Sequence, residues 1–464
     1  MTHPNMTARE KDIAFHLHPY TNLALHERKG PIVMEKGEGI YVIDTEGKRY
    51  IEGLAGLWCS SLGFSEERLV EAAASQLRQL PYNHTFAHRS HESNIELAEK
   101  LIDIAPVPMS KVFFTNSGSE AVDTAVKLVW YCNNALGRPK KKKIISRLQA
   151  YHGVTVATAS LTGIPYVHED FDLPIANILH ADCPHYYRFG QEGESEDAFA
   201  SRMAENLDEL IAQEGPDTVA AFIAEPIQGA GGVIVPPATY FDKVQEVLRR
   251  HDVLFIVDEV ICGFYRTGNL WGSETYDLKP DIMTCAKALS ASYLPIGAVM
   301  ISEPIYRALV KESEKIGLFG TGYTYTGHPV PAAVALETLK IYDERNVLDH
   351  VRRVAPRMQA RLEALADRPL VGEARGRGLI GAIQLVADKE SKRLFDPSLK
   401  LGAFAMDRAL DHGLIVRALM NDTVAVCPPL IITEAEVDDL FDRFERALDD
   451  TLRRVESENL RAAS

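Results

Sequence analysis

The sequence predicts an α/β protein built on a mostly parallel sheet with helices on both faces. Short, apolar, β-prone runs alternate with helical patterns through the middle of the chain. Such alternation is typical of parallel strands joined by crossover helices. The two ends of the chain carry a different pattern, so they are expected to form a smaller α+β lobe.

The middle of the chain supplies the strands and helices of the large sheet. Apolar residues recur at helical spacing in SEAVDTAVKLVWYC (119–132), and YFDKVQEVLRRH (240–251) is amphipathic, so both segments are predicted to be helices. The predicted strands are KVFFTN (111–116), KIISR (143–147), TVAAFIAE (218–225), VLFIVD (253–258), IMTCAK (282–287) and GAVMIS (297–302).

The flanking regions predict the smaller lobe. GIYVIDTEGKRYIEG (39–53) has the pattern of a hairpin that turns at TEGK. Two helical patterns follow residue 330, then strand patterns, and EVDDLFDRFERALDDTLRRV predicts a closing helix. We therefore expect residues 1–65 and 330–464 to form the two parts of a small domain, and residues 66–329 to form the large domain.

Composition excludes several classes of function. The 464 residues are 46% apolar and 25% charged, which is typical of a soluble globular protein. The net charge of −15 argues against nucleic acid or an anionic membrane as the main partner. No apolar targeting segment or spanning stretch is visible, so we expect a cytoplasmic protein.

Cysteine and histidine spacing predicts no metal site. The six cysteines are scattered without a CxxC pair, which argues against a disulfide framework or a zinc centre. The histidines at 152, 168, 180 and 185 are irregularly spaced.

Polar groups follow several of the predicted strands. Asp258 and Glu259 come where a buried strand ends, and an unpaired charge there is costly. Asn116–Ser119, Glu225 and Lys287 follow other strands. Because ligands of open α/β sheets bind beyond the carboxyl ends of the strands, one site could collect all of these groups.

Three of these groups together match the needs of pyridoxal 5'-phosphate (PLP). A lysine such as Lys287 in a dry pocket can bond to a carbonyl, and Asp258 can pair with a pyridine nitrogen. The loop TNSGSEA (115–121) could bind a phosphate, or simply cap a helix through Ser117 or Ser119. Glu259 is then expected to be structural. GRGLIG (376–381) matches a dinucleotide fingerprint, but the apolar run after it predicts a strand, not the required helix.

At this point the chain resembles a known family. FIVDEVICGFYRTG (255–268) followed by KPDIMTCAKALS (279–290) is similar to the signature of class III, fold type I PLP-dependent aminotransferases, close to the pyruvate-using omega-transaminases. The resemblance runs from LWCSSLGF to GLIVRAL. Two positions depart from the family pattern, because Tyr265 stands where Gly is usual and Ala288 follows the lysine where Gly is common.

The resemblance implies a set of cofactor-binding residues. Lys287 would be the lysine that bonds to the cofactor and shuttles the proton, and Asp258 would pair with the pyridine nitrogen. Thr324 would reach the cofactor of a partner subunit, with Tyr323 beside it, which makes a homodimer with shared sites. The other implied contacts are Gly118 and Ser119 at the phosphate, Tyr151 and Val260 on the two faces of the ring, and Glu225 near the phenolic oxygen.

The resemblance also implies a substrate pocket. Trp58, Phe86, Tyr151 and Ala230 would line it, and aromatic walls favour apolar or aromatic amine tails. Arg417 matches the position of a mobile arginine that pairs with a substrate carboxylate, a task that suits its bidentate geometry.

The implied activity is amino transfer from a primary amine or omega-amino compound to pyruvate, through alternating PLP and pyridoxamine phosphate forms. Diamines, beta-alanine and arylalkylamines all remain possible donors. The alternatives are a 2-oxoglutarate-dependent 4-aminobutyrate or ornithine type, and a PLP decarboxylase or mutase of the same fold. A PLP-binding regulator is less favoured, because neither end offers a DNA-binding segment.

Overall fold

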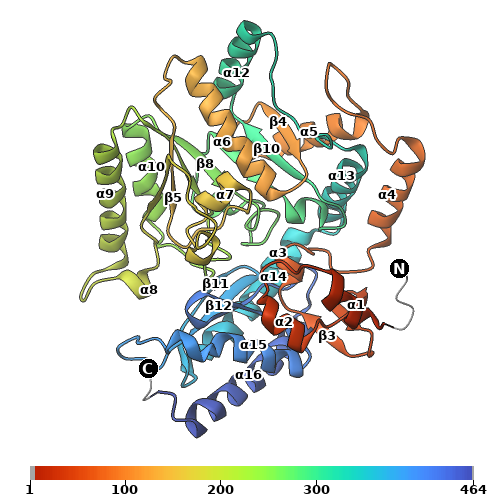
Figure 1. Cartoon of the computed structure of the whole chain (residues 1–464), viewed down its shortest axis with the longest axis vertical. Helices are drawn as coiled ribbons and strands as arrows, with labels where there is room; N and C mark the ends of the chain where they lie inside the picture. Colours follow the sequence, from red (N-terminus) through yellow and green to blue (C-terminus); the bar gives the residue numbers. More distant parts are fainter. Residues whose placement is uncertain (1–5, 462–464) are drawn as a thin grey trace.

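The computed structural model describes residues 6–461 and arranges them as a large sheet region above two smaller sheets (Figure 1). Residues 1–5 and 462–464, the outer ends of the predicted small domain, lie outside the described residues. Within the described chain no helix is both long and apolar enough to cross a membrane.

The large sheet has seven strands in the order β4-β10-β9-β8-β7-β5-β6. β10 runs antiparallel to both of its neighbours, and the pairs β9–β8, β8–β7, β7–β5 and β5–β6 are parallel. This confirms the predicted α/β class. The strands are β4 (Lys111–Thr115), β5 (Lys143–Arg147), β6 (Ile178–Ala181), β7 (Val219–Ala224), β8 (Leu254–Asp258), β9 (Ile282–Cys285) and β10 (Gly297–Ile301).

Helices cover both faces of this sheet because alternate strand residues point to opposite sides. Ile144 and Ile256 pack in a cluster with α6 and α12, whereas Ile145 and Val257 pack in another with α9 and α10. The helices of this region are α6 (Gly118–Ala135), α7 (Val156–Leu161), α8 (Tyr186–Phe189), α9 (Glu196–Glu214), α10 (Tyr240–Arg250), α11 (Gly272–Thr275) and α12 (Glu303–Ile316), with short 3-10 turns η1 (Pro165–Val167) and η2 (Lys287–Ser290).

The lower region joins the two ends of the chain. The strand β13, near the C-terminus, pairs in parallel with β3, near the N-terminus, so both ends contribute to one four-stranded sheet. The hairpin expected at residues 39–53 is present, and the carboxylate of Asp44 caps its turn by accepting from the backbone N–H groups of Glu46 and Lys48. This sheet contains β1 (Met34–Glu38), β2 (Tyr41–Asp44), β3 (Arg49–Glu52) and β13 (Leu414–Ile415).

A second four-stranded sheet, β11-β12-β15-β14, lies beside it. The GRGLIG segment forms the tight turn between the antiparallel strands β11 and β12, so it lacks the strand–turn–helix context of a dinucleotide site. The strands are β11 (Val371–Arg377), β12 (Ile380–Leu385), β14 (Arg417–Leu419) and β15 (Thr423–Val426).

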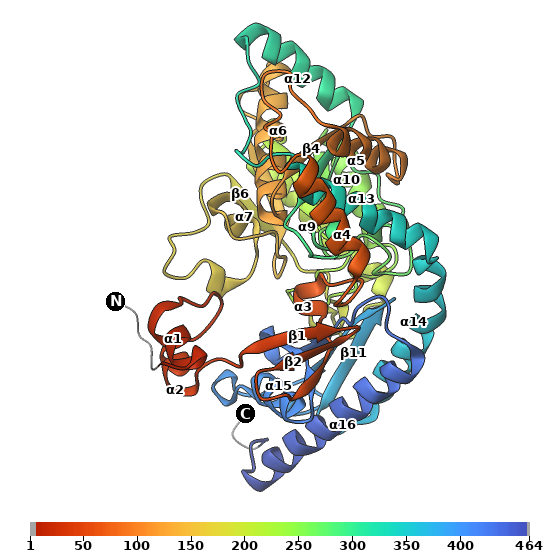
Figure 2. The ribbon, with the colours of Figure 1, turned by 90° about the vertical axis from the view of Figure 1, so that its right-hand side faces the viewer.

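The remaining helices wrap the outside, and the long α14 and α16 run along the lower region (Figures 1 and 2). α13 packs on α4 and α5 at the side of the large sheet. The domain boundaries expected near residues 65 and 330 stay a prediction. The remaining helices are α1 (Ala8–Phe15), α2 (Leu23–Lys29), α3 (Ala55–Trp58), α4 (Glu67–Gln79), α5 (Glu92–Asp103), α13 (Pro329–Glu344), α14 (Val347–Ala364), α15 (Leu401–Asp411) and α16 (Glu434–Ser457), with the 3-10 turns η3 (Leu365–Asp367), η4 (Pro397–Leu399) and η5 (Met420–Asp422).

Candidate functional site

The predicted site groups follow the carboxyl ends of strands that share one edge of the large sheet. β8 ends at Asp258, Glu225 follows β7, Lys287 comes two residues after β9, and α6 begins just after β4. β4 and β9 run in the same direction, because each is antiparallel to β10. The topology therefore brings these groups to the same edge.

Asp258 is held in a fixed position inside the protein. Its side chain is almost fully buried, with His152 Nδ1 2.7 Å from Oδ2. Its other oxygen accepts from the backbone N–H of Val260 at 3.1 Å and from the hydroxyl of Thr284 at 3.2 Å. Such hydrogen bonds keep a buried carboxylate oriented and partly offset the cost of burying it.

His152 was not among the residues predicted for the site. It directly follows Tyr151, is fully buried and joins a carboxylate 106 residues away along the chain. Its second ring nitrogen, Nε2, is buried with no hydrogen-bond partner among the described residues. The sequence carries a weak signal for it, since AYHG places a histidine beside the predicted ring-stacking tyrosine.

Glu259 serves the scaffold, as expected. Its carboxylate accepts from the backbone N–H groups of Gly272 at 2.9 Å and Ser273 at 2.6 Å, and from the Ser273 hydroxyl. Burial raises the pKa of this carboxyl to about 7. Glu259 therefore fastens the turn at the start of α11, while its neighbour Asp258 is bound to His152.

Lys287 sits in a strained backbone conformation. Its φ of 51° lies in the left-handed region that lysine rarely adopts, and such strain is concentrated at functional sites. Its Nζ lies 5.8 Å from the ring centroid of Trp58. Burial lowers the pKa of the Lys287 ammonium, and the nearby carboxylates of Asp258 and Glu225 only partly oppose that effect. A lowered pKa favours the neutral amine, the form that bonds to a carbonyl.

The loop before α6 forms both a cap and an anion cradle. Ser117 is the N-cap, and its hydroxyl accepts from the backbone N–H of Glu120 at 3.1 Å. The first N–H groups of a helix lack partners within the helix and attract anions. A Cβ on Gly118 would lie 3.0 Å from Val260 Cγ1, so glycine permits the loop to approach Val260. The Ser119 hydroxyl accepts from the backbone N–H of Val154 at 3.2 Å.

Glu225 fixes two further predicted residues. One carboxylate oxygen accepts from the backbone N–H of Tyr151 at 3.0 Å, and the other accepts from that of Gly229 at 2.9 Å. Gly229 precedes Ala230, so Tyr151 and Ala230 are tied to the same carboxylate. Burial raises the pKa of Glu225, as expected for an acid without a paired cation.

Two cations lie close to the ring of Trp58. The guanidinium carbon of Arg417 is 5.2 Å from the indole centroid, and Lys287 Nζ is 5.8 Å from it. Trp58 is buried, and its φ of 57° is again left-handed. The structure thus brings together Trp58, Lys287 and Arg417 from three distant parts of the sequence.

Phe86, Tyr323 and Thr324 lie in a different environment. Phe86 is 47% exposed. Its ring packs against Gly322 and fills the space that a Cβ at that position would occupy. Thr324 is exposed, and its carbonyl accepts from the Tyr82 hydroxyl at 2.7 Å. The Tyr323 hydroxyl lies 3.2 Å from that of Thr124 on α6. Among the described residues, the hydrogen bonds and ring contacts of this segment do not reach Lys287 or Asp258.

The two departures from the family pattern meet at one side chain. Tyr265 has a φ of 74°, a conformation that favours glycine, and its ring lies edge-on to that of Tyr342 at 5.5 Å between centroids. The Tyr342 hydroxyl donates to the carbonyl of Ala288 at 2.7 Å, next to Lys287. Tyr265 therefore packs against Tyr342, whose hydrogen bond to Ala288 holds the backbone beside Lys287.

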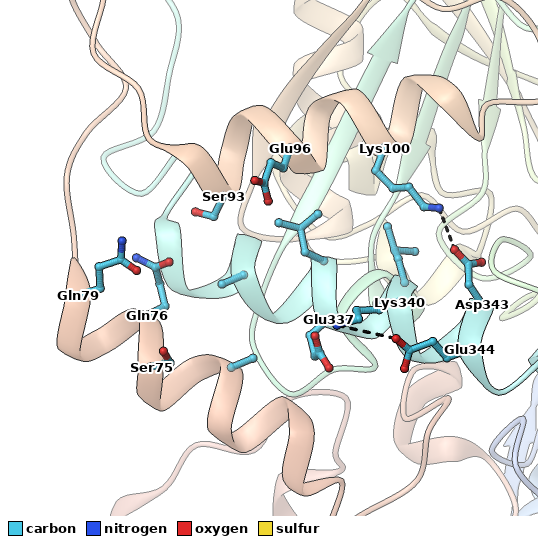
Figure 3. A pocket seen from close by; sticks show the side chains of 14 residues that line it. Ser75, Gln76, Gln79, Ser93, Glu96, Lys100, Glu337, Lys340, Asp343 and Glu344 are labelled. Carbon is cyan, nitrogen blue, oxygen red and sulfur yellow. Dashed lines mark hydrogen bonds and ion pairs between the residues drawn. The ribbon is translucent and has the colours of Figure 1, made fainter.

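A cavity of about 550 Å³ lies apart from this site, between α4, α5 and α13 (Figure 3). The described residues that line it include none of those predicted for the site. Both lysines of its lining pair with lining carboxylates, Lys100 with Asp343 at 2.8 Å and Lys340 with Glu344 at 3.8 Å. The cavity therefore offers neither the lysine nor the carboxylate of the chemistry considered above.

The architecture agrees with what comparison with known proteins finds. The class III aminotransferase family model matches residues 23–448. Gamma aminobutyrate transaminase 3, chloroplastic, from Solanum lycopersicum is 52% identical over 92% of this chain and 82% of its own length. Vanillin aminotransferase from Capsicum annuum is 51% identical over 92% of this chain and 93% of its own.

Solved structures lead to the same family. The omega transaminase from Pseudomonas jessenii in complex with PMP has a TM-score of 0.96 and 55% identity, covering 97% of this chain and 99% of that one. A transaminase with L-Ala has a TM-score of 0.90 and 57% identity, covering 91% of this chain and all of its own. The chain therefore belongs to the class III aminotransferases, which have the type I fold and use PLP as cofactor.

Proposed function

We propose that this aminotransferase moves an amino group from a primary amine or omega-amino compound to pyruvate, leaving an aldehyde or ketone and L-alanine. The observation that carries the proposal is the pairing of Arg417 with the apolar face of Trp58, beside Lys287. One pocket then offers an apolar wall for the amine and one cation for the single carboxylate of pyruvate.

The names of the relatives support this choice of substrates. A transaminase that is 57% identical to this chain has been solved with L-Ala, which is the product of adding an amino group to pyruvate. Other relatives are named for gamma-aminobutyrate and for vanillin. The first carries a primary amine at the end of its chain, and the second is an aldehyde, the class of product that a primary amine leaves.

The proposed roles are those that the family resemblance implies, and the geometry of the site supports them. PLP, when bound, withdraws electrons from the bond that breaks at the amine carbon. The amine of Lys287, with its lowered pKa, takes the proton from that carbon. Asp258, held by His152, keeps a proton on the ring nitrogen. Gly118 and Ser119 bind the phosphate at the start of α6.

Other side chains position the ring and the substrate. Tyr151 and Val260 hold the ring between them, and Glu225 orients Tyr151 while lying near the phenolic oxygen. Trp58 and Ala230 line the amine pocket. Arg417 binds the carboxylate of the keto acid.

The alternative acceptor, 2-oxoglutarate, carries a second carboxylate that needs a second cation. The two cations that lie over the Trp58 ring are Lys287 and Arg417, and Lys287 is assigned to the reaction. Arg147 is fully buried and donates through Nη2 to the carbonyl of Glu225 at 2.6 Å, whereas its Nε and Nη1 have no hydrogen-bond partner among the described residues. These contacts favour an acceptor with one carboxylate.

A panel of donors and acceptors tests the proposal. We expect pyruvate to exceed 2-oxoglutarate by at least about tenfold in kcat/KM, which corresponds to roughly 1.4 kcal/mol. The donors would be 4-aminobutyrate, a diamine, beta-alanine and an arylalkylamine, with alanine and glutamate formation measured directly. A preference for 2-oxoglutarate with every donor would overturn the choice of acceptor and leave the aminotransferase assignment intact.

Adjacent carboxylates provide a matched pair of variants. Asp258→Asn should keep the fold and lose most of the turnover, because the ring nitrogen would no longer be held protonated. Glu259→Gln should lower the free energy of unfolding by about 1–3 kcal/mol, since one of the buried donors at Gly272 and Ser273 is left unpaired. Its turnover per cofactor-loaded molecule should fall far less. Thermal unfolding, cofactor absorbance and initial rates distinguish the two, and near-normal turnover of Asp258→Asn would contradict its role.

Arg417→Ala should separate the two half-reactions. Conversion of the bound cofactor to its amino form by an uncharged amine should change little, because that amine has no carboxylate. The return step with pyruvate should weaken by roughly 1.5–3 kcal/mol, the range for a hydrogen bond to a charged group. Single-turnover absorbance measures each step. An apolar aldehyde acceptor serves as the control, and equal slowing of both half-reactions would mean that Arg417 is structural.

We further propose that the enzyme is a homodimer. Its second copy would cover an exposed aromatic patch formed by Tyr82, Phe86 and Tyr325. Tyr82 and Tyr325 lie edge-on at 5.9 Å, and they, like Phe86, are exposed in the single chain. Grouped exposed aromatic residues are typical of an interface. Thr324 lies among them, where it would reach the cofactor phosphate of the partner subunit, and Phe86 would line the partner's pocket.

Mixed dimers test the shared site. Thr324→Ala and Lys287→Ala chains should each be weakly active alone, whereas a mixed dimer has one intact site and one site with both lesions. Random exchange of equal amounts should restore about a quarter of wild-type turnover, because half of the dimers are mixed and half of their sites are intact. Affinity tags on the two chains verify the exchange. No recovery in verified mixed dimers would show that Thr324 does not act across an interface.

A further inference from the structure

The N-terminal segment contains a cluster of one carboxylate and three imidazoles. Asp12 Oδ1 lies 2.8 Å from His18 Nε2 and 3.1 Å from His26 Nε2, and Asp12 Oδ2 lies 3.1 Å from His16 Nδ1. The rings of His16 and His18 are 4.3 Å apart between centroids, and those of His18 and His26 are 4.2 Å apart. All three histidines therefore direct a nitrogen at the same carboxylate.

This cluster joins two helices that have no core of their own. α1 and α2 contain no buried residue among those that the structure describes. Asp12 and His16 lie one turn apart at the end of α1, His18 follows in the connecting loop, and His26 comes from α2. Because apolar burial contributes little here, polar contacts connect the two helices: this cluster, and a hydrogen bond from the Arg9 guanidinium to the carbonyl of Lys29.

We propose that Asp12, His16, His18 and His26 form a binding site for a divalent transition metal, with Zn²⁺ as the best-fitting ion. Three imidazoles and one carboxylate form a four-ligand set that suits tetrahedral Zn²⁺. The ligand atoms of Asp12, His16 and His18 all lie within 4.8 Å of one another, and His26, which lies outside this group, reaches the same carboxylate at 3.1 Å. Zn–N bonds of about 2.0–2.1 Å place tetrahedral ligands roughly 3.4 Å apart, so three ligands are nearly in place and the His26 side chain must move further to complete the set.

The imidazoles of the cluster can act either as N–H donors to the carboxylate or as lone-pair ligands of a metal. A neutral imidazole has one N–H and one lone pair, and three crowded rings that were all protonated would repel one another. A bound dication lets each histidine direct a lone pair inward while the carboxylate balances part of the charge. His26 is nearly buried and His16 is largely exposed, so solvent can reach the site from the His16 side.

The cluster lies next to the proposed amine pocket. Between the second and third histidines the chain passes through Tyr20, whose ring lies edge-on to Tyr166 at 6.5 Å. Burial raises the pKa of Tyr151, and the adjacent Tyr20 hydroxyl adds to the effect. Figure 2 shows α1 and α2 beside the segment that follows α7. A bound metal would hold Tyr20 in place at the rim of the proposed amine pocket. This effect on the pocket rests on the proposed function, but the metal site itself is independent of it.

Metal analysis of the holoenzyme tests the site without any activity assay. After treatment with a chelator and dialysis against Zn²⁺, the wild-type protein should retain about one Zn²⁺ per chain by elemental analysis. The paired variant His18→Ala/His26→Ala should retain none, whereas His168→Ala, a histidine outside the cluster, should match the wild type. Retention in the wild type that equals the paired variant would overturn the proposal.

A conservative variant covers the case in which the alanine substitutions disorder the segment. Asp12→Asn keeps the size of the side chain but removes the anionic ligand, so its Zn²⁺ affinity should fall at least tenfold. Co²⁺ in place of Zn²⁺ should give the visible absorption of a tetrahedral site in the wild type and lose it in this variant. Zn²⁺ should also slow proteolysis between α1 and α2 in the wild type alone. Unchanged Zn²⁺ affinity in Asp12→Asn would contradict the four-ligand site.

Discussion

The buried carboxylate of Asp258 is the group on which the rest of the site depends. A charge at the end of a buried strand is costly unless it is hydrogen-bonded and paired. Here His152 and Thr284 come from two other parts of the sheet edge to hold it. The carboxylate is thus oriented before any ligand arrives, which is how a site avoids the cost of ordering its groups on binding.

Asp258 and Glu259, which are adjacent at the end of β8, have different proposed roles, the first in the chemistry and the second in the scaffold. Successive residues at a strand end point to opposite sides, so Asp258 and Glu259 experience different surroundings. Glu259 fastens the turn at Gly272 and Ser273, and that turn helps to position the strand end that carries Asp258. Burial raises the pKa of Glu259 to about 7, and the hydrogen bonds from Gly272 and Ser273 partly oppose that effect by stabilising its charged form.

Much of this could be predicted from the sequence, because parallel strands place their carboxyl ends together. That rule, with the DEVICGF and CAKALS segments, predicted the convergence of Asp258, Glu225 and Lys287. His152 was missed because its partner is 106 residues away, and no spacing rule connects them. The Asp12 cluster was missed because its histidines come from the end of α1, the connecting loop and α2, and only the turn of the chain between the helices brings them together.

The surface residues illustrate a second limit of sequence-based prediction. Phe86 and Thr324 were predicted as site residues through family resemblance. In a single chain, however, they lie on an exposed patch together with Tyr82 and Tyr325. Their proposed roles depend on a second copy of the chain. Periodicity describes how a chain covers its own core, and it does not show which exposed aromatic residues a partner will cover.

Under the proposed function, Trp58 would explain how one pocket accepts both an uncharged amine tail and a carboxylate. A cation over an aromatic face is stabilised by about 0.5–2 kcal/mol, so the position of Arg417 over the indole gives the guanidinium a resting place when no carboxylate is present. A charge-assisted bond to a carboxylate is stronger, roughly 1.5–3 kcal/mol, so the keto acid can draw Arg417 away. In the proposed mechanism, these two energies lie close enough for Arg417 to exchange between the indole and the carboxylate. A much stronger stacking contact would hold Arg417 on the indole, and a much weaker one would leave an unpaired charge facing the amine.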